Sequence, residues 1–170
     1  MATAPVSGDE LAITRRRWWR WAWLPGLLVL LACGWWWLMH PADLPTSDRE
    51  LTASVKAGQT VYLGVPAGDT KGRTLDIRSA SIEADGADVS LWVCHGGSVS
   101  TTTNPEPFCS DWTEAEGSEF KLADGDQLVV GVQADSPGTV EVGRVTLDFN
   151  DGLQRGSSPF GPTYAVDFLG

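Results

Sequence analysis

The sequence predicts an all-β domain, an antiparallel β-sandwich of jelly-roll or immunoglobulin-like type with about seven or eight strands, preceded by one N-terminal transmembrane helix. Three observations support this fold class. A long uncharged apolar run lies near the N-terminus, short apolar runs separated by Gly, Asp and Pro follow it, and that second part contains two cysteines. The expected organisation is a cytoplasmic leader at 1–17, a signal-anchor helix at 18–39, a linker at 40–48 and an extracytoplasmic domain at 49–170.

The expected anchor centres on an apolar run from Trp21 to Met39 that contains no charged residue. At about 1.5 Å per residue the run reaches roughly 28 Å, close to the hydrocarbon thickness of a bilayer. Tryptophans gather at both of its ends, as they do at the depth of lipid headgroups, and arginines precede it. Because basic flanks stay in the cytoplasm, we expect the N-terminus inside and the rest of the chain outside. The anchor residues are Arg15, Arg16, Arg17, Arg20, Trp18, Trp19, Trp35, Trp36 and Trp37.

A second interpretation of this segment is a cleaved signal. The stretch from Leu30 to Cys33 resembles a bacterial lipobox, and the stretch from Thr14 to Trp19 loosely resembles a twin-arginine export signal. The residues after Cys33 stay apolar, however, whereas a mature lipoprotein normally turns polar at this point. We therefore favour an uncleaved anchor, with a lipoprotein attached through Cys33 and ordinary signal cleavage as the alternatives.

The formal charge of −10 is divided unevenly along the chain. Residues 1–20 carry four Arg against two acidic residues, whereas residues 42–170 carry three Lys and five Arg against twenty acidic residues, a balance of −12. Such a domain should repel nucleic acid and an anionic membrane surface. Solubility is the simpler interpretation of these acidic side chains, and an acidic face that recruits a cation or a basic partner is the alternative. Arginine outnumbers lysine nine to three, which favours a bacterial source with a GC-rich genome.

The apolar runs of the external domain predict strands by their period of two. Turn dipeptides stand between them at Asp85-Gly86, Asp124-Gly125 and Pro137-Gly138, and each supplies a residue that tolerates positive φ. The alternation shifts by one residue at Gly143, which indicates a β-bulge or bend. The expected strands are 50–55, 59–65, 73–83, 88–94, 118–122, 127–134 and 139–149.

The C-terminal part divides into two expected segments. Residues 150–162 are rich in Gly, Ser and Pro, which predicts a loop. From 163 to 168 the alternation resumes, with Tyr164, Val166 and Phe168 on one face. We expect a final strand that closes a sheet; a strand that completes a partner's sheet and a disordered tail are the alternatives.

The two external cysteines, Cys94 and Cys109, are expected to form a disulfide in an oxidising compartment. They lie in or beside the longest irregular stretch, 95–117, and loops of that length are usually functional or mobile. The alternation places Trp92 on the face of Cys94, so this side chain should pack against the bridge or under the loop. The candidate binding residues are therefore Trp92, His95, Phe108 and Trp112, with a small core around the bridge as the simpler interpretation and an aromatic binding surface as the alternative.

The sequence offers no recognisable catalytic or metal motif. His95-Gly96-Gly97-Ser98 resembles the oxyanion motif of some esterases, but no Gly-x-Ser-x-Gly elbow follows it. Zinc would need four N or S ligands at finger-like spacing, and the domain lacks them. We expect no catalytic residue, no cofactor and no metal; the weak calcium candidates, in turns without EF-hand spacing, are Asp85, Asp88, Asp124 and Asp126.

The expected function is that of a non-catalytic binding or assembly module, held at the bacterial cell envelope by a single membrane-spanning helix. Its expected partners are the lipid bilayer and another envelope or extracellular protein or glycan, and not nucleic acid. The alternatives are a passive structural subunit of an envelope complex and a small envelope-tethered hydrolase or an inhibitor of one. A hydrolase would need a deep pocket in which acid, base or nucleophile groups converge.

Overall fold

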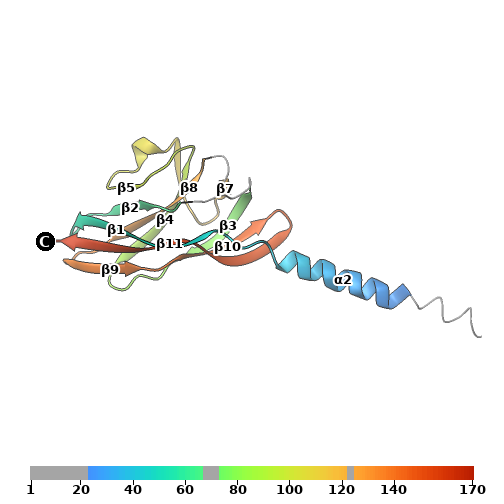
Figure 1. The fold of residues 1–170 in the computed structure, drawn as a ribbon. Coiled ribbons are helices and arrows are strands. Elements are labelled where there is room, and N and C mark those ends of the chain that lie inside the picture. The colour runs from blue at the N-terminus through green and yellow to red at the C-terminus, as the bar shows by residue number, and fades with distance from the viewer. Residues whose placement is uncertain (1–22, 67–72, 122–124) are drawn as a thin grey trace, which may run out of the picture. The chain divides into compact units, whose positions relative to one another are not determined.

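The computed structural model describes residues 23–66, 73–121 and 125–170 (Figure 1). They belong to two compact units, Met1–Leu38 and Met39–Gly170, which are described separately below. Asp124, Trp18, Trp19 and the four expected anchor arginines lie outside the described residues.

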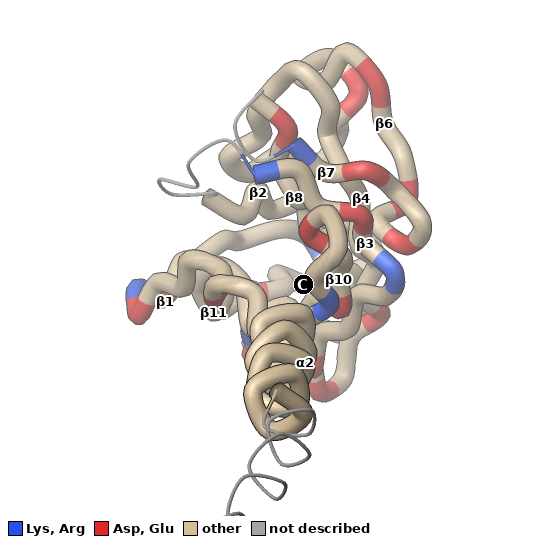
Figure 2. Tube along the Cα trace, turned by 90° about the vertical axis from the view of Figure 1, so that its right-hand side faces the viewer, with Lys and Arg blue, Asp and Glu red and all other residues tan. Residues whose placement is uncertain are grey.

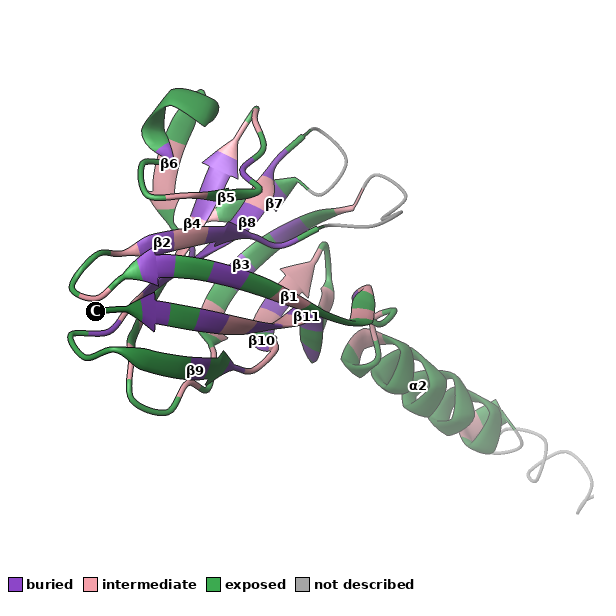
Figure 3. Cartoon of the chain, turned by 60° about the vertical axis from the view of Figure 1, so that its left-hand side comes forward, coloured by how far each residue is buried: buried purple, intermediate pink, exposed green. Residues whose placement is uncertain are grey.

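Helix α2, Trp23–Met39, belongs to the first unit up to Leu38, and its 17 residues include no charged side chain (Figure 2). None of these residues is buried, and Figure 3 colours most of the helix as exposed. Its exposed residues include large apolar ones from Trp23 to Met39. Leu30, for example, is 71% exposed. Within the described residues, no helix combines the length and the hydropathy that a membrane span requires.

The second unit is an all-β sandwich, as expected, whose described residues form two sheets. The six-stranded sheet has the order β1-β11-β10-β3-β7, with β9 also paired to β11, and the five-stranded sheet has the order β5-β2-β8-β4-β6. The strands are β1 (Thr46–Lys56), β2 (Val61–Gly64), β3 (Thr74–Ser81), β4 (Asp88–His95), β5 (Thr101–Thr102), β6 (Asp111–Glu114), β7 (Glu119–Lys121), β8 (Gln127–Gln133), β9 (Gly138–Val142), β10 (Val145–Asp151) and β11 (Gln154–Leu169).

The inner faces of the two sheets form one core, and the alternation of buried and exposed positions is visible along β11 (Figure 3). Within this core, Phe120 and Phe160 meet edge to face with ring centroids 6.0 Å apart, and Phe149 is fully buried. Burial of such rings is the main favourable term in the stability of a small sandwich. The alternating residues predicted to face inward are buried or packed against this core, among them Val61, Leu63, Val65, Leu75, Ile77, Val93, Val140, Val142, Val145 and Leu147.

The predicted shift at Gly143 is confirmed. Val142 lies opposite Tyr164, and Val145 lies opposite Phe160. A step of three residues within 139–149 is therefore matched by a step of four residues along β11. The mismatch divides the predicted strand 139–149 into β9 and β10 and reverses which residues face the core.

Three expectations about the sandwich were wrong. The strand pairing is not wholly antiparallel, because β1 runs parallel to β11. The predicted loop 150–162 is strand along most of its length, since β10 continues to Asp151 and β11 begins at Gln154. The described residues contain eleven strands rather than seven or eight, partly because β5 and β6 lie within the stretch 95–117 that was expected to be irregular.

Candidate functional site at the disulfide loop

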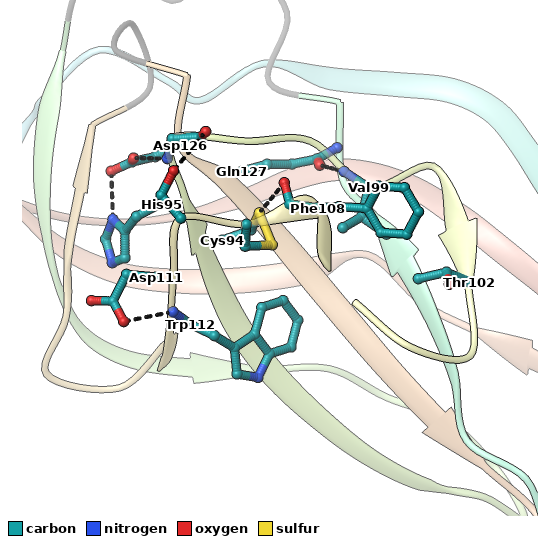
Figure 4. The surroundings of a disulfide bond; sticks show 12 residues. Cys94, His95, Val99, Thr102, Phe108, Asp111, Trp112, Asp126 and Gln127 are labelled. Atoms are coloured by element: carbon teal, nitrogen blue, oxygen red, sulfur yellow. Dashed lines mark hydrogen bonds and ion pairs between the residues drawn. A yellow bond between two sulfur atoms is a disulfide. The ribbon is translucent and has the colours of Figure 1, made fainter. Parts of the chain in front are cut away.

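The predicted disulfide between Cys94 and Cys109 is present, with a Cα–Cα distance of 5.2 Å. It joins the end of β4 to the residue that follows the 3₁₀ helix η1 (Glu106–Phe108). The loop between them is tightly folded, because a Cβ atom on Gly97 would lie 1.9 Å from the carbonyl oxygen of Phe108. Only glycine allows this approach, and the same carbonyl lies 3.9 Å from the Cys94 sulfur (Figure 4).

Three aromatic rings lie together on the outer face of the five-stranded sheet. Trp92 stacks on Trp112 with ring centroids 5.4 Å apart and an interplanar angle of 17°. Tyr62 from β2 meets Trp112 edge to face, with centroids 5.7 Å apart. The Nε1–H of Trp92 donates to Ser90 Oγ at 3.1 Å. All three aromatic residues are half-buried, so each ring contributes to packing and leaves part of its surface open.

Beneath these rings lies a second, smaller core. It contains Cys94, Val99 and Val129, of which Cys94 and Val129 are fully buried. Tyr62, Trp92, Cys109 and Trp112 pack against it. Trp92 and Trp112 therefore pack against the cluster that contains Cys94, which agrees with the expectation that Trp92 lies against the bridge or under the loop.

Phe108 differs from the other aromatic residues of this region. It occupies the last position of η1 and is 55% exposed, and it does not belong to the small core. A phenyl ring that projects from a loop closed by a disulfide has few conformations to lose on binding, because the loop is already ordered. We call the four residues Tyr62, Trp92, Phe108 and Trp112 the disulfide face.

His95 is separated from the disulfide face. Side chains alternate along β4, so His95 points to the side of Val93 and away from Trp92 and Cys94. Its Nδ1 lies 2.9 Å from Asp126 Oδ2 and its Nε2 lies 3.1 Å from Thr113 Oγ1. Figure 4 shows the imidazole directed at Asp126 rather than at Trp112. The predicted grouping of His95 with the aromatic residues is therefore not what the structure brings together.

Asp126 holds the base of the disulfide loop. Its carboxylate is only 8% exposed and accepts hydrogen bonds from the backbone N–H groups of Gly96 and Lys121, at 3.3 and 3.0 Å, as well as facing His95. Buried carboxylates are tolerated when such donors surround them. These donors contact the carboxylate oxygens that a calcium ion would bind. In this structure Asp126 therefore holds the backbone of Gly96 and Lys121 in place.

Thr113, His95 and Asp126 place a hydroxyl, an imidazole and a carboxylate in a row, an order that catalytic triads also have. The residues around them decide whether this arrangement could act as a triad. A triad needs free backbone N–H donors for the developing oxyanion. The N–H of Gly96 donates to Asp126, and the N–H of Gly97 donates to the Gly125 carbonyl at 3.2 Å. Three cavities bounded by described residues, of about 640, 490 and 390 Å³, have linings that include neither His95 nor Thr113.

The calcium candidates that the structure describes do not form a metal centre. Asp85 lies in the largest of these cavities with Glu50, Glu83 and Glu141, and Asp88 is an exposed residue at the start of β4. In the described part of the chain, no three His, Cys, Asp or Glu side chains are grouped closely enough to hold a metal ion.

Tyr62 is the residue of the disulfide face that the sequence analysis did not single out. Its position between the inward residues Val61 and Leu63 indicates an outward-facing aromatic ring, and that signal is visible in the sequence. The partners of His95 gave no such signal, because Thr113 and Asp126 are 18 and 31 residues away along the chain.

Comparison with known proteins adds no relative from which a function could be transferred. The chain matches no protein-family model and no curated protein.

Proposed function

We propose that this chain is a membrane-anchored protein of the bacterial cell envelope whose β-sandwich acts outside the membrane as a non-catalytic binding or assembly module. The sandwich would be of the jelly-roll or immunoglobulin-like type, which its two layered sheets favour. The observation that carries the binding proposal is the disulfide face, with Phe108 55% exposed on a loop fixed by the Cys94–Cys109 bond.

The anchor is supported by the surface of α2 and by the residues that precede it. Leu, Val and Trp side chains on this helix are open to the surroundings, and exposed apolar surface of this extent calls for an apolar environment. The arginines before the helix favour a cytoplasmic N-terminus. Cys33 is an exposed free thiol, so a lipid attached to it would be the alternative means of anchoring. The disulfide favours an oxidising compartment for the sandwich.

Binding through the disulfide face is supported by its chemistry. Aromatic side chains dominate the energetics of binding surfaces, and an ordered loop lowers the entropy cost of association. The partner would be another envelope or extracellular protein or a glycan. Nucleic acid is disfavoured because residues 42–170 carry a formal charge of −12, from eight basic against twenty acidic residues.

The test compares two exposed apolar residues at different places on the sandwich. Phe108 is 55% exposed on the disulfide face, whereas Leu169, 56% exposed, ends β11. A photo-crosslinking amino acid at position 108 in intact cells should capture a partner, and one at position 169 should not. With the captured partner in hand, Phe108→Ala should weaken its binding to the chain roughly 30-fold in a pull-down titration, equivalent to about 2 kcal/mol for a hot spot, while Leu169→Ala leaves the binding unchanged.

Phe108→Ala is preferred to Trp112→Ala because Trp112 also covers the small core, so its loss would affect folding. Equal affinity of the wild-type protein and a folded Phe108→Ala variant for that partner would contradict the binding proposal. Capture through α2 alone would favour a passive structural subunit. Hydrolysis of an envelope substrate that disappears in His95→Ala would favour the hydrolase alternative.

A further inference from the structure

The segment that leads into the sandwich runs along β11 before β1 begins. The N–H of Gly161 donates to the Pro45 carbonyl at 3.1 Å, and the N–H of Leu44 donates to Ser158 Oγ at 3.3 Å. Further back, Pro41 packs so closely on Gly156 that a Cβ atom there would lie 2.3 Å from Pro41 Cγ. The segment 41–45 therefore continues the parallel course of β1 toward the beginning of β11.

A second set of contacts ties this segment to the hairpin formed by β10 and β11. Arg73 Nη1 donates to the Asp43 carbonyl at 3.2 Å, and Arg73 Nε pairs with Asp151 Oδ2 at 2.9 Å. The guanidinium lies 5.7 Å from the centroid of the Phe149 ring. The side chains of Arg73 and Asp151 are 17% and 28% exposed, so solvent screens this pair less than an open surface pair.

These contacts place the turn of the hairpin at the level where the chain enters the sandwich. Pro41 lies beside Gly156; Met39 precedes Pro41 by two residues, and Leu153 precedes Gly156 by three. At about 3.3 Å per residue, each of these two residues projects by at most roughly 10 Å beyond the Pro41–Gly156 contact. Figure 1 shows this turn at the opposite end of the sandwich from the C-terminus.

The turn exposes a large apolar side chain. Leu153 is 81% exposed, more than any other large apolar residue of the described chain, and follows Gly152, whose φ is +59°. A single exposed leucine is common on protein surfaces, so the exposure of Leu153 alone is weak evidence for a contact. Its place beside the entry of the chain gives it significance.

The charge at this turn differs from the balance of the domain. Between residues 150 and 156 the chain carries one acid, Asp151, and one base, the exposed Arg155, and Asp151 is already paired with Arg73. Residues 42–170 as a whole carry −12, from eight basic against twenty acidic residues. Asp43 in the entering segment adds one acid and Arg73 one base, so the charges named at this end balance, and an anionic lipid surface repels it less than the acidic remainder.

We propose that the turn between β10 and β11 contacts the bilayer surface, with Leu153 inserted at headgroup depth beside the point where the anchor emerges. The inference rests on the proposed membrane anchor. The contact would fix the sandwich with its hairpin turn toward the membrane and its C-terminal end away from it.

The test uses the full chain in vesicles of phosphatidylethanolamine and phosphatidylglycerol. An environment-sensitive fluorophore is attached through Leu153→Cys, or through Leu169→Cys as the matched control, in a Cys33→Ala background that keeps the Cys94–Cys109 bond. The probe at 153 should show blue-shifted emission that lipid-borne spin labels quench, and the probe at 169 should show emission typical of water.

Flotation of the vesicles separates the possible failures. Protein that floats with the vesicles while the probe at 153 stays in water would leave the anchor standing and overturn the contact. A blue shift at 153 without quenching by the lipid labels would mean that a protein surface covers Leu153, which also overturns it. Protein that does not float would disprove the anchor and the contact together.

Discussion

Asp126 and Ser158 are polar residues buried in the sandwich, and each fastens a connecting segment to a strand. Asp126 accepts hydrogen bonds from the backbone of Gly96 and Lys121, and Ser158 accepts one from the backbone of Leu44. A buried oxygen that lost these donors would keep the cost of desolvation without compensation. Single polar atoms therefore determine how the disulfide loop and the entering segment are held.

A similar polar arrangement on the six-stranded sheet affects stability in acid. Asp148 on β10 lies opposite Ser157 on β11 and Ser79 on β3, and Ser79 Oγ donates to its carboxylate at 2.7 Å. The hydrogen bonds from Ser157 and then from Ser79 hold the pKa of Asp148 below its ordinary value of 3.8, and attraction to Arg78 acts in the same direction. Desolvation opposes this shift.

Ser157→Ala should reduce this effect and raise the pKa of Asp148 toward 3.8. A carboxyl whose folded pKa is depressed stabilises the protein above its unfolded pKa, and that contribution is lost as the pH falls through the folded value. The variant should therefore be less stable than wild type at neutral pH, by about 0.5–1 kcal/mol, with the difference disappearing in acid. Chemical denaturation across pH measures this, with Ser136→Ala as a control away from Asp148; a loss that stays constant down to the lowest pH would contradict the assignment.

At the scale of single residues, the sequence predicted which face of a strand a side chain occupies better than it predicted which distant residue that side chain contacts. The alternation placed Val93 inward and Trp92 on the side of Cys94, because strand periodicity is a local property. It could not indicate that His95 would face Asp126, since that pairing depends on how β4 and the start of β8 meet in space. Cys94 and Cys109 were predictable partners because residues 49–170 contain no other cysteine.

At the scale of elements, β11 connects most of the six-stranded sheet. Its first part pairs with β10, and its second part pairs with β1 on one side and β9 on the other. The prediction of a loop at 150–162 was wrong because it relied on Gly and Pro content. Proline is tolerated where a strand has a paired strand on one edge only, as Pro159 does beside β10. Gly161 adopts a φ of +77° at the point where β11 changes its partner from β10 to β9.

The disulfide loop is the element whose stability can be tested most directly. Cys94 and Cys109 are 15 residues apart, and closing such a loop is worth about 3 kcal/mol in the chain-entropy model. Cys109→Ser should lower the free energy of unfolding by about this amount, and should also loosen the packing of Trp112. Denaturant titration followed by tryptophan fluorescence measures both changes, provided that the seven tryptophans between positions 18 and 37 are replaced by phenylalanine so that only Trp92 and Trp112 contribute.

Cys33→Ser is the matched control. Because Cys33 is a free cysteine in α2, this substitution should leave the unfolding of the sandwich unchanged. Alkylation before and after reduction checks the bond itself. Alkylation of both Cys94 and Cys109 in protein recovered without reductant would disprove the bond.

At the scale of the whole molecule, composition predicted the all-β class of the second unit but not the arrangement of its strands. Alternation and turn residues were sufficient for a two-sheet all-β domain. The parallel pairing of β1 with β11 was not predictable, because these strands lie at opposite ends of the domain sequence and no short connection fixes their direction. The parallel pairing bears on the proposed anchor, because it carries the entering chain along β11 toward the hairpin turn, where Pro41 meets Gly156.

The proposed topology across the membrane can be tested with single cysteines in intact cells. In a Cys33→Ala background, Ser7→Cys in the leader should resist an impermeant thiol reagent, and Ser136→Cys in the exposed turn before β9 should react, because the arginines retain the leader inside. Permeabilised cells provide the control, in which both positions become reactive. Labelling of the leader alone in intact cells would reverse the orientation, whereas metabolic attachment of a lipid to Cys33 in the wild-type chain, with the mature protein beginning there, would replace the spanning helix by a lipid anchor.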